Sequence, residues 1–357
     1  MIRQHRNTEL MSRAVRGARC GALTLAVAMA MATVPSRAQT GKTHQLKPTL
    51  STVEWGYYDA SAKPALRVAS GDILEVETVL HAAEVLRRYG MEEKWVTDEM
   101  RMFDQIKDRG VGGHLLLGPV YVEGAEPGDV LEVKLLEIRG REAFGVNLFR
   151  PNGGTIPSEF PYGRFKTVPV DLKANVAQFS PTIEIPLAPF FGSIGVAPPA
   201  MVGRISSSPP GVHTGNLDNK DLVSGTTLYI PVHVKGALLS IGDGHLAQGH
   251  GEVDGTALEA ALFGRLQVIV RKDLKLIWPR AETPTHYITM GLNEDLDEAA
   301  RLATREMVEY LSEAYNLTPA DAYALASMVV DLHVTQTVDG VKGVHAALPK
   351  SIFKGAR

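Results

Sequence analysis

Short runs of alternating apolar and polar residues recur along the chain, and this pattern constrains the fold more than any other feature. Residues 64–79, PALRVASGDILEVETV, alternate on both sides of a Ser-Gly-Asp turn, and residues 118–139 repeat the arrangement around Glu-Pro-Gly-Asp. A period of two is typical of strands with one buried face, and Gly-Asp favours a tight turn. The sequence therefore predicts pairs of strands joined by tight loops. Further pairs are expected at 226–234 with 237–243 and within 265–282.

Helical periodicity is confined to two parts of the chain. Residues 81–111 have helical spacing and charge pairs, which predicts a small helical insertion. Near the C-terminus, 293–316 is amphipathic, and 318–334 opens with Thr-Pro-Ala-Asp, which suits a helix N-cap followed by proline. Between these parts, 148–210 is rich in proline and glycine, as in long connections that often line sites. We expect a mainly β fold of sandwich- or barrel-like sheets, with helices in the C-terminal third.

The N-terminus has the three-part pattern of a secretory signal peptide over residues 1–38. A leader with five arginines precedes an apolar run at 21–34, and Ser-Arg-Ala at 36–38 supplies small residues before a cleavage point. The apolar run is shorter than the ~20 residues that cross a bilayer, so a retained membrane anchor is the weaker interpretation. We expect residues 39–357 to form one domain in the periplasm or outside the cell.

The charge and the cysteine content of this domain exclude several partners and mechanisms. The chain has a net charge of −3, and the leader holds six basic residues and one acidic residue, which leaves −8 after cleavage. This charge argues against nucleic acid or an anionic membrane surface as a partner. Cys20, the single cysteine, lies in the leader, so the domain has no cysteine nucleophile. No later segment is apolar enough for a stable membrane span.

Residues 242–252, GDGHLAQGHGE, hold the densest set of metal-binding side chains in the chain. Asp243, His245, His250 and Glu252 lie among four glycines directly after an expected strand, where sites are often built. Imidazole and carboxylate groups are ordinary ligands of zinc and similar ions, and Glu252 is then the expected general base toward water. The alternative is a glycine-rich surface turn with solvated polar groups. Composition alone leaves both interpretations open.

A second polar cluster, at 206–222, contains His213, Asn216, Asp218 and Asp221. Asn and Asp are common turn residues, which is a sufficient explanation for this stretch taken alone. The two clusters nevertheless lie at the two ends of the strand pair expected between residues 226 and 243, so they are candidates to converge on one site.

Residues 213–259, which run from HTGNLDNKDL through GDGHLAQGHGE to VDGTALE, resemble the core of the acetamidase/formamidase family. The resemblance includes GHLLLGPVYVEGAEPGDVLEV, APFFGSIGVAP and PRAETPTHYITMG, in the same order, and covers residues 53–353. The Gly-Asp-x-His-x-x-x-Gly-x-Gly-Glu element is its most specific part. Two positions differ: Thr214 stands where the family usually has glycine, and His250 stands where it usually has aspartate.

The resemblance implies that a short linear amide, such as formamide or acetamide, is hydrolysed to a carboxylate and ammonia. It also implies a β-rich catalytic domain, a divalent metal, above all zinc, and a homo-oligomer. By motif, three residues become metal ligands or their immediate supports: Asp218, Asp243 and His245. Asn216 then orients a ligand or the amide, His114 is a ligand or a substrate contact, and Glu252 moves a proton from water to the leaving amine. His213 and His250 are weaker candidates.

Other classes of amide hydrolase do not fit the sequence. Nitrilase-type enzymes need a cysteine nucleophile, and the serine run at 206–208 is followed by Pro-Pro rather than by the glycines of amidase-signature enzymes. In FFGSIG, Phe191 takes the place of the first glycine of Gly-x-Ser-x-Gly, and His-Glu-x-x-His is absent. Two competing hypotheses stay open: a periplasmic binding protein that kept the fold without turnover, and a hydrolase of another small carbonyl compound.

Several other conspicuous residues are expected to be structural. Trp55, Tyr57 and Tyr58, in EWGYYD, are interpreted as core or interface residues rather than as a substrate cage. Glu282 lies beside a proline-containing turn and is expected to be solvated. His333 is expected to cap a helix end or to be a buried polar residue.

Overall fold

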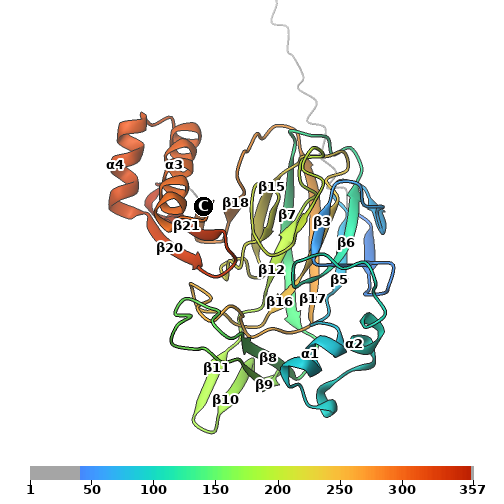
Figure 1. The fold of residues 1–357 in the computed structure, drawn as a ribbon. Helices are drawn as coiled ribbons and strands as arrows, with labels where there is room; N and C mark the ends of the chain where they lie inside the picture. Colours follow the sequence, from blue (N-terminus) through green and yellow to red (C-terminus); the bar gives the residue numbers. More distant parts are fainter. Residues whose placement is uncertain (1–40, 355–357) are drawn as a thin grey trace, which may run out of the picture. The chain divides into compact units, whose positions relative to one another are not determined.

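The computed structural model describes residues 41–354, and the predicted leader with its cleavage point lies outside them. The described residues are mainly β, as predicted, and two sheets dominate them (Figure 1). The larger sheet has nine strands in the order β1 (Thr43–Leu46), β5 (Ile73–Glu77), β17 (Leu262–Arg271), β7 (Val130–Gly140), β15 (Thr226–Pro231), β18 (Arg280–Glu282), β19 (His286–Asn293), β21 (Lys342–Pro349) and β20 (Asp331–Gln336). The second has six strands, in the order β14 (Thr214–Asn216), β12 (Phe190–Gly195), β16 (Leu239–His245), β6 (Leu115–Val122) and β2 (Val53–Trp55), with β4 (Leu66–Val68) also paired to β6.

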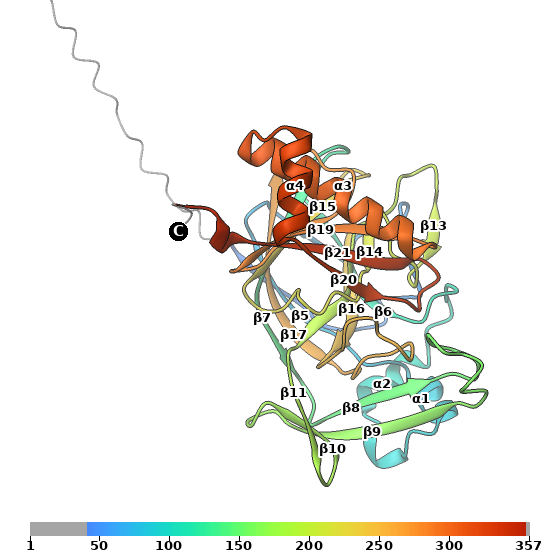
Figure 2. The ribbon, with the colours of Figure 1, turned by 90° about the vertical axis from the view of Figure 1, so that its left-hand side faces the viewer.

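Two smaller sheets extend from these. One contains β11 (Ile183–Pro186), β10 (Val176–Ser180), β9 (Arg164–Asp171) and β8 (Phe144–Phe149), and the other pairs β13 (Arg204–Ser206) with β3 (Tyr57–Asp59). The proline- and glycine-rich region of the sequence therefore does contain short strands. The four-stranded sheet projects from the main body beside the first two helices (Figures 1 and 2).

The main core lies between the nine-stranded and the six-stranded sheet. Buried residues of β5, β7 and β17 form one apolar cluster with buried residues of β6, β12 and β16. The sheets approach closely, because a Cβ atom at Gly264 on β17 would lie 2.6 Å from the ring of Phe191 on β12. A Cβ atom at Gly244 on β16 would lie equally close to Leu262 on β17, at 2.6 Å. The two sheets thus pack as a sandwich with their apolar faces inward.

The predicted strands form, but none of the four predicted pairs is a hairpin. β4 and β5 lie in different sheets, as do β6 and β7, and β15 and β16, while β17 and β18 are separated in one sheet by two other strands. In the first two loops an aspartate carboxylate accepts a hydrogen bond from the backbone N–H three residues earlier, Asp72 at 3.0 Å and Asp129 at 2.9 Å. This chemistry closes the turn. It does not select the partner strand, which comes from elsewhere in the chain.

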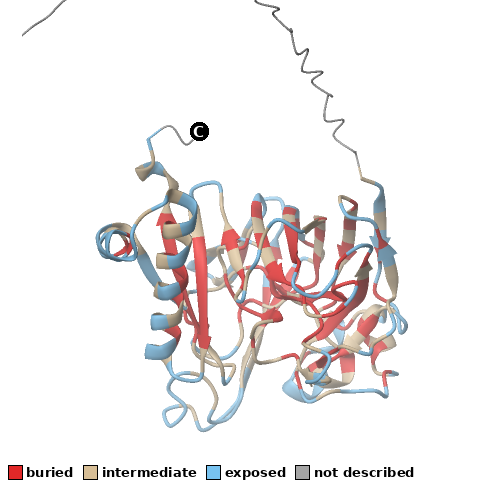
Figure 3. Ribbon diagram, turned by 90° about the horizontal axis from the view of Figure 1, so that it is seen from above, coloured by how far each residue is buried: buried red, intermediate tan, exposed pale blue. Residues whose placement is uncertain are grey.

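The helices occupy the predicted regions. α1 (Ala83–Tyr89), a 3-10 turn (Glu93–Trp95) and α2 (Asp98–Phe103) form the small insertion, and α3 (Leu296–Tyr315) and α4 (Pro319–Val329) follow β19. α3 lies against β19 and β21 and turns its apolar side toward them (Figures 2 and 3). The prediction of a helix to residue 334 is wrong beyond Val329, because the chain becomes extended there and pairs as β20 with β21. None of the helices in 41–354 is both long and apolar enough to span a membrane.

A half-buried carboxyl on β2, that of Glu54, makes the stability of the protein dependent on pH. Burial, followed by the nearby charge of Asp59, raises the pKa of Glu54 to about 7 from its ordinary value of 4.5. Glu54 has a higher pKa in the folded state than in the unfolded state, so its ionisation destabilises the fold. This destabilisation is absent below pH 4.5 and grows until the pH passes about 7. We expect Glu54→Gln to stabilise the protein at pH 8 by about 1–3 kcal/mol and to have little effect at pH 4. Urea unfolding at both pH values measures this, with the exposed Glu159→Gln as control. Equal effects at the two pH values would contradict it.

Candidate active site

Three strands of the six-stranded sheet bring the predicted ligands together. Asp243 and His245 are two residues apart on β16, so their side chains leave the strand on the same face. β12 lies between β16 and β14, and the chain leaves β14 at Asn216. Asp218 follows, and its backbone N–H donates to the carbonyl oxygen of Gly192 on β12 at 3.1 Å. The two polar clusters of the sequence therefore do meet, across β12.

Gly192 provides the space in which these side chains meet. A Cβ atom at this position would lie 2.4 Å from Oδ2 of Asp243, 2.5 Å from Oδ1 of Asp218 and 2.7 Å from Cε1 of His245. No larger residue fits without displacing all three side chains. Sequence reasoning missed Gly192, because the FFGSIG stretch that contains it has no feature of a metal site and does not match the Gly-x-Ser-x-Gly motif.

The imidazole of His245 lies at the centre of this group. Its Nε2 atom is 3.4 Å from Oδ1 of Asp243 and 3.2 Å from Oε2 of Glu259, and its Nδ1 atom is 3.8 Å from Oδ1 of Asp218. The Nδ1 atom is also 2.9 Å from Oε1 of Gln248, whose Nε2 donates to the carbonyl of Asp218 at 2.7 Å. Because the amide of Gln248 uses its nitrogen as that donor, its oxygen accepts from Nδ1–H of His245. This leaves Nε2 of a neutral His245 available as a ligand atom.

The backbone is strained where the acidic side chains leave it. Asp218, Asp243 and Glu252 have φ angles of 49°, 55° and 43°, in the left-handed region that residues other than glycine rarely adopt. Thr214, at the start of β14, has φ of 72°. Such conformations cost of order 1–3 kcal/mol each and persist where the surrounding structure requires them. The strain thus coincides with the acidic residues that the sequence predicts to be functional.

Two further acidic residues complete the site, and sequence reasoning missed both. Oxygen atoms of Glu252 and Glu259 lie within 4.8 Å of a nitrogen atom of His245, and Asp339 lies within the same distance of Asp218 and Glu252. Glu259 is held by paired backbone hydrogen bonds with Val146, at 2.8 and 2.7 Å. Asp339 follows β20 in an Asp-Gly stretch that reads as an ordinary turn. Neither carries a local signal, because each comes from a different segment of the chain.

Asn216 and His114 both lie at this site. Nδ2 of Asn216 donates to Oδ2 of Asp218 at 2.7 Å, which fixes the direction of that carboxylate. Nε2 of His114 is 3.9 Å from Oδ2 of Asp243, and its Nδ1 is 2.9 Å from Oγ of the buried Ser207. His114 therefore lies at the periphery of the group, at the start of β6, where it can contact a ligand or a substrate.

Buried negative charge dominates the electrostatics. Burial, and then the neighbouring carboxylates, raises the pKa values of Asp218 and Glu252 well above their ordinary range. Burial also raises the pKa of Asp339 to about 6, although a hydrogen bond with Asp218 and the charge of His114 act in the opposite direction. Burial acts in the same direction on Asp243, but the imidazoles of His114 and His245 outweigh it and hold the pKa of Asp243 low. A cation among these groups would offset their mutual repulsion.

The donor set fits a divalent metal ion. Asp218, Asp243 and His245 offer ligand atoms within 4.8 Å of one another, as do His245, Glu252 and Glu259. Zinc with bonds of about 2.0–2.2 Å takes such nitrogen and oxygen ligands. Oδ1 of Asp218 and Nε2 of His245 are buried and lack a hydrogen-bond partner within the described chain. A metal ion is the natural partner for both atoms.

A cavity of about 360 Å³ opens onto this site. Asp243, Glu252, Glu259 and Asp339 form its acidic part, and side chains of the α1 region form an apolar wall opposite. Trp55, which is 6% exposed, and His81 contribute to that wall, with ring centroids 5.0 Å apart in an edge-to-face arrangement. Trp55 is therefore both a packing residue and a wall of the cavity.

The other candidates lie elsewhere. His213 is buried against Tyr58, with ring centroids 5.0 Å apart, and Tyr57 is also buried. Glu282 pairs with Lys350 at 2.5 Å and does not line the cavity. His333 is on β20, not on a helix end, so the capping role proposed from the sequence is wrong. His250 and Asp221 lie beside His333, in a separate cluster described below.

Comparison with known proteins places this arrangement in a family. The acetamidase/formamidase family model matches residues 64–207 and 204–355. A formamidase of Methylophilus methylotrophus is 27% identical over 63% of this chain and 73% of its own length. The crystal structure of an acetamidase from Bacillus halodurans is 32% identical with a TM-score of 0.75, over 87% of this chain and 99% of that one. The crystal structure of an acetamidase from Yersinia enterocolitica is 25% identical in sequence with a TM-score of 0.77, over 88% of this chain and 94% of that one. The chain belongs to the acetamidase/formamidase family.

Proposed function

We propose that this protein is a metal-dependent hydrolase of a short linear amide, with carboxylate and ammonia as products. Its family makes it a hydrolase of carbon–nitrogen bonds other than peptide bonds, in linear amides. The metal dependence is supported by one observation above all. The side chains of Asp218, Asp243 and His245 converge on the space beside Gly192. The backbone of the two aspartates is strained, and His245 ends its strand. Two of the ligand atoms of these residues have no hydrogen-bond partner within the described chain.

The side chains around this space suit amide hydrolysis. Asp218, Asp243 and His245 would hold a divalent ion, which would polarise the amide carbonyl and offset the negative charge that develops on its oxygen. Glu252, buried and open to the same cavity, takes a proton from the attacking water and gives it to the leaving nitrogen, which departs as ammonia. Asn216 keeps the carboxylate of Asp218 in place.

The size and charge of the cavity favour a small neutral substrate. A volume of about 360 Å³ is near the lower end of ligand pockets. The apolar wall formed by Trp55 and the α1 region suits a hydrogen atom or a short alkyl group on the carbonyl carbon. The four carboxylates of the cavity lining outnumber the one arginine there, Arg150, which disfavours an anionic substrate and helps to expel the carboxylate product. Formamide and acetamide, the substrates that the names of the relatives suggest, satisfy both conditions.

Metal removal tests this proposal. We expect the purified protein to contain a divalent metal, and we expect a chelator to abolish ammonia release from formamide and acetamide. Added zinc is expected to restore it. Asp243→Asn, which removes a charged ligand without changing side-chain size, is expected to lose the activity even with added zinc. Activity that survives complete metal removal would exclude the mechanism. Bound metal without turnover of either amide would favour a different carbonyl substrate or the binding-protein hypothesis.

Location and assembly are part of the same proposal. The basic leader, the apolar run and the small residues before position 39 support export to the periplasm or beyond. N-terminal sequencing of the mature protein and fractionation of the producing cells test this, and a mature chain that retains the leader would contradict it. We also propose a homo-oligomer, by similarity to the family, which light scattering of the purified protein measures.

A further inference from the structure

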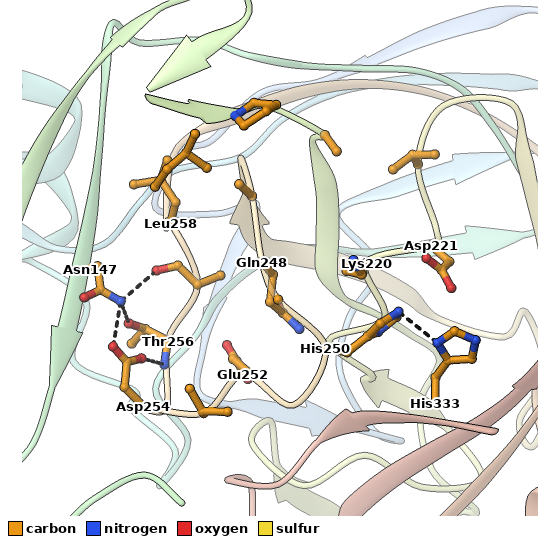
Figure 4. Close-up of a pocket in the computed structure, with 18 of the residues that line it drawn as sticks. Asn147, Lys220, Asp221, Gln248, His250, Glu252, Asp254, Thr256, Leu258 and His333 are labelled. Atoms are coloured by element: carbon orange, nitrogen blue, oxygen red, sulfur yellow. Dashed lines mark hydrogen bonds between the residues drawn. The ribbon is translucent and has the colours of Figure 1, made fainter. Parts of the chain in front are cut away.

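Three histidines meet on the far side of the loop that carries Glu252. His333 and His345 are directly paired across β20 and β21, and their rings are stacked with centroids 5.0 Å apart. His250, on the loop after β16, lies against both, with ring centroids 4.7 Å from His333 and 5.2 Å from His345. Figure 4 shows His250 and His333 pointing toward one another, with Asp221 beside them. None of these residues belongs to the candidate active site.

Two pairs of atoms in this cluster are spaced as neighbouring ligands of one metal ion are. Nε2 of His250 is 3.1 Å from Nδ1 of His333, and Nε2 of His345 is 3.0 Å from Oδ2 of Asp221. A tetrahedral zinc site with metal–ligand bonds of ~2.0 Å places its ligand atoms about 3.3 Å apart. One ligand atom from each of the three histidines lies within 4.8 Å of the others. Rotation of the half-buried rings of His250 and His333 can bring these atoms to the spacing of a zinc site.

The surroundings support an ion at this position. Nδ1 of His345 is 2.7 Å from Oγ1 of Thr335, which orients the ring and leaves Nε2 to face the cluster. His345 is buried, whereas His250, His333 and Asp221 line an open cavity of about 1180 Å³ through which an ion can enter. Lys220 lines the same cavity, and its charge opposes a cation (Figure 4). The carboxylate of Asp221 offsets that charge.

We propose that His250, His333 and His345, together with Asp221, form a second binding site for a divalent transition-metal ion, of which zinc is the best match. Three imidazoles and one carboxylate are a typical zinc ligand set and a poor one for magnesium or calcium, which prefer oxygen ligands. This site is separate from the site at Asp243 and does not depend on it.

The position of the second ion gives it a role in holding the active-site loops. Asp221 lies three residues after Asp218, and His250 lies two residues before Glu252. The intervening Gly251 is already joined to β20, since its N–H donates to the carbonyl of Thr335 at 3.0 Å. An ion at the histidine cluster therefore ties the segments that carry Asp218 and Glu252 to the β20–β21 pair.

Metal counting on the tag-free chain tests the proposal. After incubation with zinc and desalting, we expect about two equivalents per chain in the wild type and about one in His333→Ala or His250→Ala. Asp243→Asn is expected to retain the ion at the histidine cluster. The double variant Asp243→Asn, His333→Ala is expected to bind neither ion. His286→Ala, a histidine in the same cavity but outside the cluster, is the matched control and is expected to match the wild type. An unchanged metal count in both His250→Ala and His333→Ala would overturn the proposal.

Two readouts separate this result from the fate of the active site. In Asp243→Asn, zinc is expected to raise the unfolding temperature by several degrees, and this shift is expected to vanish when His333→Ala is added. Cobalt in place of zinc is expected to give visible absorption bands in Asp243→Asn that the double variant lacks. If the active site proved free of metal, the wild type would hold about one equivalent, and the single substitution His333→Ala would be enough to remove it. Circular dichroism confirms that each variant is folded, and absence of both readouts in Asp243→Asn would count against the proposal.

Discussion

Glu252→Gln is expected to lower kcat for ammonia release from formamide or acetamide by about 10²–10⁴-fold. Glutamine has nearly the same shape but cannot accept a proton from water at this position. Glu252 is 6% exposed and lies against His245 and Asp218, so no solvent base can readily replace it. Steady-state kinetics with both amides measure the effect, and the metal content of the variant is determined in parallel.

The metal content decides how such a loss is interpreted. We expect Glu252→Gln to retain as much metal as the wild type, because Asp218, Asp243 and His245 are unchanged. Loss of metal together with activity would make Glu252 a ligand rather than a base. Full activity would mean that another carboxylate, with Glu259 the nearest alternative, moves the proton. Glu159→Gln, at an exposed position that does not line the cavity, is the control for changing a glutamate.

Gly192→Ala is expected to reduce kcat/KM by at least ~10²-fold while the protein remains folded. The added methyl group would lie 2.4–2.7 Å from atoms of Asp243, Asp218 and His245. All three are side-chain atoms rather than backbone, so the fold can yield at small cost by turning these side chains away. The same movement separates the ligand atoms, and a displacement of about 1 Å is enough to cost 10²-fold in rate.

A second glycine in the adjoining loop provides the matched control for Gly192→Ala. A Cβ atom at Gly249 would meet nothing within 4 Å, so Gly249→Ala is expected to retain wild-type activity and metal content. Metal analysis, kinetics and thermal unfolding of the two variants together distinguish a collapsed site from general damage. Wild-type kinetics in Gly192→Ala would show that the space beside β12 has no catalytic importance.

The local parts of the fold and site were predictable from the sequence, and the non-local parts were not. Asp243, His245 and Glu252 lie within one loop and the end of one strand, so their types and spacing mark them as candidates, and the family resemblance implies their roles. Glu259 and Asp339 join them only because distant strands pair as they do. Gly192 has an unexceptional backbone, and what requires a glycine there is the set of side chains that face it.

The same division explains the errors in the fold. Alternation predicted the strands, and turn chemistry predicted the reversals between them, but neither contains information on which strand pairs with which. His333 illustrates this, because its segment continues a helical pattern until pairing with β21 draws it into a sheet. The histidine cluster was invisible for that reason, since His250 and His345 reach it from other segments.

Three of the four predicted strand pairs cross from one sheet to the other, and this has a consequence for how the chain acquires its structure. β5 and β7 do not pair with each other but with the two edges of β17, which begins at Leu262. An N-terminal fragment that ends before Leu262 therefore lacks the strand that joins β5 to β7 in the larger sheet. Folding must await most of the polypeptide, and its rate is expected to be governed by the closure of long loops rather than by hairpin formation. We therefore expect the nascent domain to complete its fold only after β17 has been synthesised.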